Sequence, residues 1–156
     1  MTSLHIKYKT SISAEEFLDA VTDFGSERGS IWDNRQSTHF TLHKLGATEA
    51  DVTEGSKVFG GVWERIHYDW SKPGIVELRT IDSNIWTNGS GWQYKLEKAE
   101  DGSGTLITAR VTRYPRSKKG YQIQIIFVSI GRPRIKISFM KKLRGLETQE
   151  KKLFSQ

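Results

Sequence analysis

The chain has 156 residues, the length of one domain, so we expect a single domain over residues 1–156. It contains no cysteine, which excludes a disulfide framework, a thiolate metal site and a cysteine nucleophile. Aromatic residues make up 11% of the chain, and this content argues against disorder. The apolar runs are far shorter than the roughly 18 residues of a membrane span. No signal peptide is visible, so a cytoplasmic protein is expected.

The first elements are a strand and a short helix. Residues 4–9 alternate between apolar and polar side chains, which predicts a half-buried strand. Ser13 and Glu16 have the spacing of a capping box, which predicts that an amphipathic helix begins here and covers 14–24. Gly25 stands where a C′ glycine would end that helix. A second short turn is expected in the glycine- and serine-rich segment that follows.

From about residue 38 the apolar pattern has a period of two, which predicts strands. The segments between the strands are rich in residues typical of turns, and short links between successive strands predict an antiparallel meander. One predicted strand is long, and Gly60 and Gly61 near its start predict a bulge or bend. The predicted strands cover 39–45, 57–70, 75–85, 90–97 and 104–114, and the turns cover 53–56, 71–74, 87–90 and 101–104.

After residue 115 the pattern becomes helical, from near Ser117 to about Glu150. Gly131 and Pro133 interrupt it, which predicts a kink or two abutting helices. The order of the elements predicts an α+β fold in which the helices lie on one face of a curved antiparallel sheet. Such a sheet, wrapped around one long helix, leaves space for a cavity between the two.

The charge is unevenly distributed. Residues 116–156 contain eleven Lys or Arg and two acids, a net charge of +9, whereas residues 1–115 carry −3. A basic tail could bind RNA or an anionic membrane surface. The bases interleave with apolar residues, which favours the solvated face of an amphipathic helix, and no aromatic residue is interleaved for base stacking. No nucleic-acid partner is expected, and contact with anionic surfaces stays an alternative.

The residues of the C-terminal helix that are expected to face the sheet are Ile126, Ile130, Ile137 and Met140.

Four segments carry a resemblance to a known family: 13–17, 62–71, 82–86 and 101–105, together with the terminal helix. The chain resembles the START-like, SRPBCC superfamily, in particular its polyketide cyclase/dehydrase branch. The resemblance implies a helix-grip fold, in which the curved sheet grips the C-terminal helix around a deep hydrophobic cavity, with one or two short helices after the first strand. It also implies binding of lipids, sterols, polyketides or plant metabolites, and in some members cyclisation or dehydration.

Glu64 and Tyr68 are the candidate catalytic residues. Both lie on the face of strand 57–70 that carries its aliphatic residues, so we expect that face to point inward. If Glu64 lay in an apolar cavity without a cationic partner, desolvation would raise its pKa and suit it to general acid or base chemistry. The alternative is a structural ion pair between Glu64 and Arg65 or Arg79.

Metal and cofactor sites are not expected. His39 and His43 are four residues apart on a predicted strand, so their side chains would lie roughly 13 Å apart, too far to share a metal. The sequence also lacks a phosphate-binding loop, a dinucleotide fingerprint and a nucleophile elbow. We therefore expect no metal and no cofactor.

Asp82 and Asn84, with Ser83 between them, interrupt a predicted strand with short polar side chains. They would either orient a ligand at the cavity wall or cap the turn that follows. The sequence leaves both alternatives open.

The favoured function is binding of a small hydrophobic ligand, such as a lipid or polyketide, between the sheet and the C-terminal helix. The alternative is a cyclase- or dehydratase-type lyase or isomerase that uses Glu64 and Tyr68, and whether any reaction is catalysed is left open. A monomer or homodimer is expected. The predicted ligand-binding residues are Trp92, Tyr94, Val62, Ile66, Leu78, Asp82, Asn84, Ile107, Ile126 and Ile130.

Overall fold

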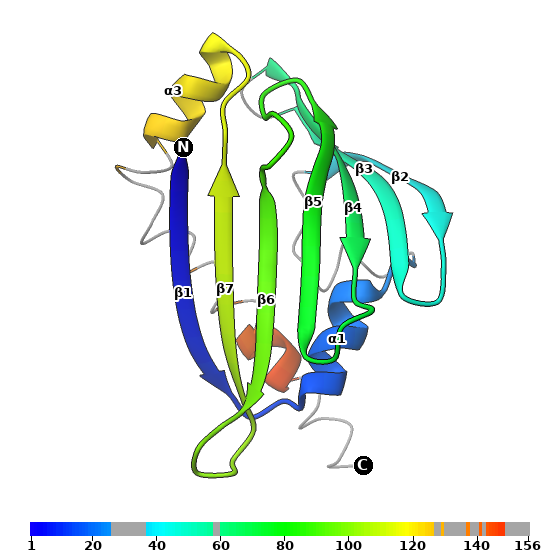
Figure 1. Ribbon diagram of the computed structural model, residues 1–156, viewed down its shortest axis with the longest axis vertical. Helices are drawn as coiled ribbons and strands as arrows, with labels where there is room; N and C mark the ends of the chain where they lie inside the picture. Colours follow the sequence, from blue (N-terminus) through cyan, green and yellow to red (C-terminus); the bar gives the residue numbers. More distant parts are fainter. Residues whose placement is uncertain are drawn as a thin grey trace.

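A computed structural model describes residues 1–25, 37–57, 60–126, 129, 137, 141 and 143–148. Seven strands form one antiparallel sheet in the order β1-β7-β6-β5-β4-β3-β2 (Figure 1). No helix among the described residues is long and apolar enough to span a membrane. The elements are β1 (Thr2–Thr10), α1 (Ala14–Thr22), β2 (Ser37–Leu45), β3 (Glu49–Ser56), β4 (Val62–Asp69), β5 (Ile75–Ser83), β6 (Gly91–Lys98), β7 (Thr105–Arg113) and α3 (Lys118–Ile126).

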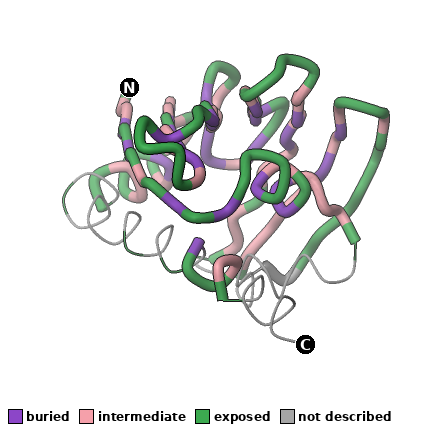
Figure 2. Tube along the Cα trace, turned by 90° about the horizontal axis from the view of Figure 1, so that it is seen from below, coloured by how far each residue is buried: buried purple, intermediate pink, exposed green. Residues whose placement is uncertain are grey.

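The antiparallel meander predicted from the short turns is confirmed, since each strand from β2 to β7 pairs with the next along the chain. β1 pairs with β7, so that the first and last strands are neighbours. The alternation that predicted the strands is also the alternation of burial, because inward side chains meet the core and outward ones meet water. Seen from below, the sheet is curved, and buried and exposed residues alternate along its strands (Figure 2).

The region from residue 49 to 70 differs from the prediction. Residues 53–56 were predicted as a turn but lie within β3, and 57–70 was predicted as one strand, whereas β4 begins only at Val62. Gly60 and Gly61 have φ angles of 71° and 87°, so they belong to the β3–β4 turn and not to a bulge in a strand. The sequence predicted a turn in place of the end of β3 because Asp, Glu and Gly, which are rare in strands, make up much of this segment.

The capping box of α1 is confirmed. The Glu16 backbone N–H donates to Ser13 Oγ at 3.1 Å, and the Ser13 N–H donates to Glu16 Oε2 at 2.6 Å. The helix ends earlier than predicted, with Asp23 as its C-cap, and Gly25 is not the C′ glycine. Instead, the Gly25 N–H donates to Asp23 Oδ1 at 2.8 Å, so a side chain supplies the acceptor at this end.

Among the described residues, two segments cover the inner face of the sheet, and the core lies between them and the sheet. From α1, the fully buried Phe17 packs edge-on against Tyr94 of β6, with ring centroids 5.4 Å apart. From the C-terminal segment, Leu143 is fully buried in the same cluster and Leu146 packs against it. Helices therefore cover one face of the sheet, as the α+β prediction required.

The C-terminal helical region begins near Ser117 as predicted, because the Gly120 N–H donates to Ser117 Oγ at 3.1 Å. Its inward face differs from the prediction, since Ile126 is 43% exposed and Ile137 is 53% exposed. Residues 143–148 are again helical. The predicted contacts of Ile130 and Met140, the kink at 131–133 and the second turn between residues 25 and 37 lie outside the described residues.

The turn between β6 and β7 provides a pH-dependent contribution to stability. Lys9 on β1 donates a hydrogen bond to the Asp101 carboxylate, and the Ser103 hydroxyl and N–H donate to Asp101 Oδ1 at 2.8 and 3.1 Å. These bonds hold the pKa of Asp101 well below its usual range. A lowered folded-state pKa adds stability that is complete above the usual pKa of about 3.9 and is lost as the pH falls toward the lowered value.

Replacing Asp101 by asparagine is therefore expected to lower the Tm at neutral pH, and the difference from the wild type should shrink as the pH falls below about 4. Thermal melts over this pH range measure the effect. Glu100→Gln at the neighbouring exposed position is the control for loss of one negative charge. A Tm difference that stays constant down to the acid limit would contradict the assignment.

Candidate ligand-binding site

A nearly buried ion pair lies on the inner face of the sheet. Arg113 Nη1, at the end of β7, donates to Glu64 Oε1 of β4 at 2.7 Å, and the two side chains are only 10% and 14% exposed. The Thr80 hydroxyl of β5 donates to the same carboxylate oxygen. Arg113 continues the inward-facing series of Ala109 and Val111. The pair thus introduces charge into a surface that is otherwise mostly apolar.

Two indole rings flank the guanidinium group. The Arg113 Cζ atom lies 5.3 Å from the ring centroid of Trp86 and 5.9 Å from that of Trp92. Trp92 in turn stacks on Tyr94, with centroids 6.2 Å apart and an interplanar angle of 26°. Aromatic faces attract a cation more strongly where water is excluded, so these rings help to hold Arg113 in place.

The partner of Glu64 differs from both of those predicted. Arg65 Nη2 lies 4.0 Å from Asp51 Oδ2, and Arg79 Nη2 lies 3.5 Å from Asp69 Oδ2. Each arginine therefore pairs with an aspartate and not with Glu64. The inward direction of the Glu64 face is confirmed. However, the condition for an isolated carboxylate in an apolar cavity is not met, because Arg113 is its cationic partner.

Tyr68 lies elsewhere on the inner face. It is buried and packs edge-on against Phe24, with ring centroids 5.1 Å apart, near the end of α1. Four residues of strand separate it from Glu64, a span of about 13 Å. This is the separation expected from the strand spacing, at which the two side chains do not touch but would face opposite ends of one ligand.

Ser83 caps the segment that follows β5, since its Oγ accepts from the Ile85 and Trp86 N–H groups at 3.1 and 3.3 Å, whereas Asp82 and Asn84 bond to other neighbouring groups. Asn84 Oδ1 accepts from the Trp63 N–H at 3.0 Å, and its Nδ2 donates to the Gly61 carbonyl at 2.9 Å. Asp82 Oδ1 accepts from the Ser83 N–H at 2.8 Å and from Arg116 at 2.7 Å. Both side chains thus join the end of β5 to neighbouring backbone and to the segment that leads into α3.

The other predicted ligand-binding residues are divided between the core and the surface. The buried ones, all on the inner face, are Ile66, Leu78, Tyr94 and Ile107. Val62 and Trp92 are half-buried, and Ile126 is exposed. Ile130 lies outside the described residues, so its role stays a prediction.

An open, mainly apolar pocket of about 700 Å³ lies beside α3, lined by Lys119, Gln122, Ile123, Ile125 and Ile126. Lys119 Nζ also donates to the carbonyls of Gly60 at 3.1 Å and Gly61 at 2.7 Å, so α3 is tied to the β3–β4 turn. Small-molecule sites usually have volumes of about 300–1,000 Å³, and this pocket has the size of such a site.

Sequence reasoning missed Arg113, Thr80 and Trp86. Arg113 carried a usable signal, since it occupies an inward position of a strand whose other inward residues are small or apolar, and charged residues are almost never buried without a partner. Among the described residues, no group of three or more His, Asp or Glu side chains is placed to hold a metal ion.

Solved structures with the same architecture identify the fold. An aromatase/cyclase from Streptomyces sp. R1128 superposes with a TM-score of 0.72 at 9% identity, covering 97% of this chain and 95% of that one. A START superfamily protein from Mycobacterium smegmatis gives 0.69 at 12% identity, covering 94% and 97%. A STAR-related lipid transfer protein from Xanthomonas axonopodis gives 0.65 at 14% identity, covering 93% and 85%.

No protein-family model matches the sequence, and a comparison with curated proteins finds no match. The structural likeness extends over nearly the whole chain, while identities of 9–14% speak for the fold alone. The curved seven-stranded sheet, with helices on one face, agrees with that likeness. The chain therefore has the fold of these START superfamily and aromatase/cyclase structures, a curved antiparallel sheet with helices on one face.

Proposed function

We propose that the protein binds a small, mainly apolar ligand that carries an oxygenated or anionic group. The observation that carries this proposal is Arg113, a nearly buried cation flanked by indole rings on an apolar inner face. A guanidinium group has five N–H donors, and Glu64 accepts one hydrogen bond from Nη1. The other N–H groups of Arg113 would donate to an acceptor atom of the ligand, while Glu64 fixes the direction of the guanidinium group.

The apolar part of the ligand would be held by the inner face of the sheet. Aliphatic and aromatic side chains from β4, β5 and β6 provide the apolar surface, and Trp92 lies where this surface meets Arg113. A pocket with apolar walls and few polar groups binds chiefly by removing apolar area from water, and its polar groups fix the orientation. The fold neighbours include proteins named as lipid transfer proteins and aromatase/cyclases, which agrees with such a ligand.

Binding is favoured over acid–base catalysis by the geometry. A general acid or base needs a proton that it can exchange within hydrogen-bond reach of a substrate. Glu64 is held as the partner of Arg113, and Tyr68 lies about 13 Å away along the strand. The cyclase or dehydratase alternative would require Glu64 to leave its ion pair with Arg113 before it could exchange a proton with a substrate.

Titration with a fatty acid is expected to change the tryptophan emission, because Trp92 is half-buried beside the proposed ligand position. Trp92→Phe should remove most of this change. Trp63→Phe is the matched control, since Trp63 is 39% exposed and lies on the opposite face of β4. Affinity should vary little with salt if apolar burial dominates.

An unchanged emission spectrum at saturating fatty acid, or a change that Trp63→Phe removes instead, would contradict the proposed position. Native mass spectrometry of the purified protein gives an independent test. A bound species of lipid or polyketide mass would support the proposal, and the mass of the species would identify its class.

A further inference from the structure

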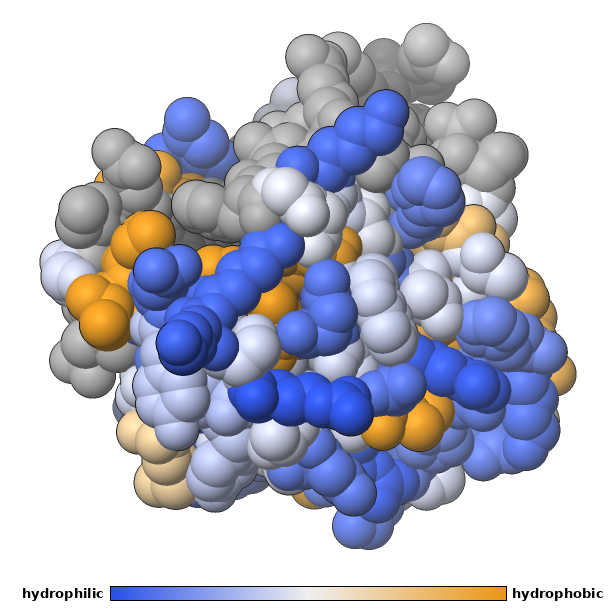
Figure 3. All heavy atoms as spheres, turned by 90° about the horizontal axis from the view of Figure 1, so that it is seen from above, coloured by the Kyte–Doolittle hydropathy of each residue, from blue (hydrophilic) through white to orange (hydrophobic). Residues whose placement is uncertain are grey.

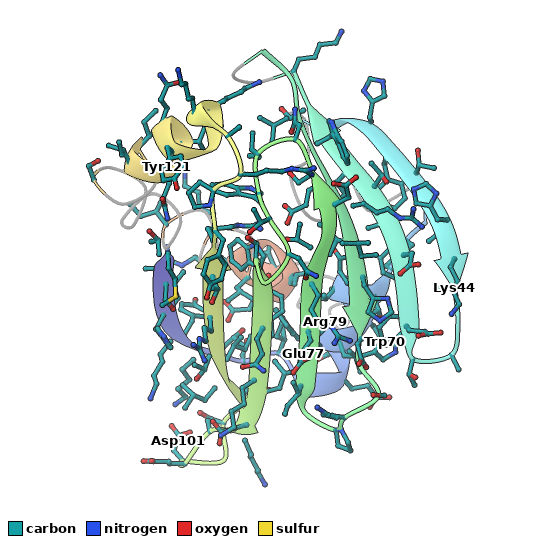
Figure 4. All side chains as sticks on the ribbon, turned by 45° about the horizontal axis from the view of Figure 1, so that its top comes forward. Lys44, Trp70, Glu77, Arg79, Asp101 and Tyr121 are labelled. Atoms are coloured by element: carbon teal, nitrogen blue, oxygen red, sulfur yellow. The ribbon has the colours of Figure 1, made fainter. Side chains whose placement is uncertain are left out.

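α3 presents an apolar surface to solvent. Ile125 is 66% exposed, Tyr121 is 59% exposed and Ile126 is 43% exposed. Viewed from above, from the end of the molecule where α3 lies, apolar atoms reach the surface beside hydrophilic ones (Figure 3). Tyr121 lies on α3, at the end of the molecule opposite Asp101 (Figure 4). The alternation of bases and apolar residues predicted that this helix would bury its apolar side, so the exposed face requires another explanation.

The opposite side of α3 is firmly attached to the sheet. Gly120 is buried, and a Cβ atom there would lie 2.3 Å from the Ile85 carbonyl oxygen, so no larger residue fits. Gln124 Nε2 donates to Thr2 Oγ1 at 2.7 Å and to the Arg113 carbonyl at 3.3 Å. These contacts fix the rotation of the helix, so the apolar face cannot turn inward without breaking them.

The surroundings of this face are basic. Lys118 and Lys119 form the first turn, and α3 contains neither Asp nor Glu. Arg116 precedes them and pairs with Asp82, with both side chains more than half exposed. A lysine beside exposed apolar side chains can meet anionic headgroups while the apolar side chains enter the acyl boundary.

We propose that α3 docks the protein onto an anionic lipid membrane through an α3 face made of Lys118, Tyr121, Ile125 and Ile126. The charge of this face selects the occupant. A second copy paired by a two-fold axis would place the same basic face against itself, and like charges oppose that association. An anionic bilayer is complementary to both the bases and the apolar side chains. Docking is independent of the proposed ligand binding and does not require it.

The test is co-sedimentation of the full chain with two kinds of vesicle, pure phosphatidylcholine and phosphatidylcholine mixed with phosphatidylglycerol. Binding is expected to the mixed vesicles and to weaken as salt is raised. Lys118→Gln should reduce the affinity about fivefold, and Ile125→Ser should reduce it about fivefold or more.

Two matched controls separate the α3 face from general surface effects. Ile81→Ser removes an isoleucine that is 45% exposed on β5, and Lys44→Gln removes an exposed charge near the β2–β3 turn (Figure 4). Neither should change vesicle binding. Circular dichroism verifies that all four variants remain folded.

Three results would overturn the proposal. The first is absence of binding to the mixed vesicles, and the second is binding that the Lys118 and Ile125 variants leave unchanged. The third is a dimer, found by light scattering, that Ile125→Ser converts to a monomer, because the face would then be a self-interface. Loss of vesicle binding with the fatty-acid titration intact would show that docking and ligand binding are separate.

Discussion

Replacing Leu143 by alanine is expected to lower the free energy of unfolding by about 2–5 kcal/mol. Leu143 is fully buried among the inward side chains of the sheet and belongs to the C-terminal segment. Truncation removes apolar area from the core and leaves a cavity that neighbouring side chains fill only in part. A second link holds the same segment, since Glu147 Oε1 accepts from Thr10 Oγ1 at 2.6 Å and from the Ser11 N–H at 3.2 Å.

Urea unfolding, followed by circular dichroism, measures this change. Ile137→Ala is the matched control, because Ile137 belongs to the same region but is 53% exposed, and its replacement should change the free energy by less than about 0.5 kcal/mol. If both variants lost the same free energy of unfolding, the side of the C-terminal segment that carries Leu143 would not be the side that packs on the sheet.

Most of the sheet could be predicted from the sequence because two signals agreed. Period-two alternation located the strands, and turn residues such as Gly74, Gly89 and Gly102, all with positive φ, marked the links. β3 was missed because Gly55 and its acidic neighbours look like a turn, although Ala50 and Val52 are buried. There, pairing on both sides by β2 and β4 overrides the low strand propensity.

The facing of the C-terminal helix could not be predicted from spacing. Isoleucines at 123, 125 and 126 lie on more than one side of a helix, so periodicity alone does not select the buried side. Gly120 determines which side of α3 is buried, because only a residue without a side chain lets the helix approach the Ile85 carbonyl. That close approach depends on tertiary structure and leaves no periodic signal.

The candidate site was predicted in part. The parity of β4 correctly placed Glu64 on the inner face, but its partner is 49 residues away. β5 and β6 lie between β4 and β7, so in a flat sheet the two backbones would be separated by roughly 14 Å. The long arginine side chain and the curvature of the sheet close this distance (Figure 2). The order of the elements predicted a curved sheet, but local alternation does not encode how near that curvature brings β4 to β7.

Replacing Glu64 by glutamine is expected to lower the free energy of unfolding by about 3–5 kcal/mol, because it leaves Arg113 as a nearly buried charge without its anionic partner. The double variant Glu64→Leu with Arg113→Met should recover much of that loss, since it removes both desolvated charges and keeps the volume similar. Arg79→Met provides a control at an exposed pair, where the loss should stay below about 1 kcal/mol.

The double variant also separates a structural role of the ion pair from a role in binding. If Arg113 supplies hydrogen bonds to a ligand, the stable double variant should bind a fatty acid more weakly than the wild type does. Its affinity for the alcohol of the same chain length, which is uncharged, should change little. Fluorescence titration of both ligands measures this difference. If both affinities fall by the same factor, Arg113 acts only through packing. If Glu64→Gln is as stable as the wild type, Glu64 does not stabilise the buried guanidinium, and the proposed orientation of Arg113 loses its support.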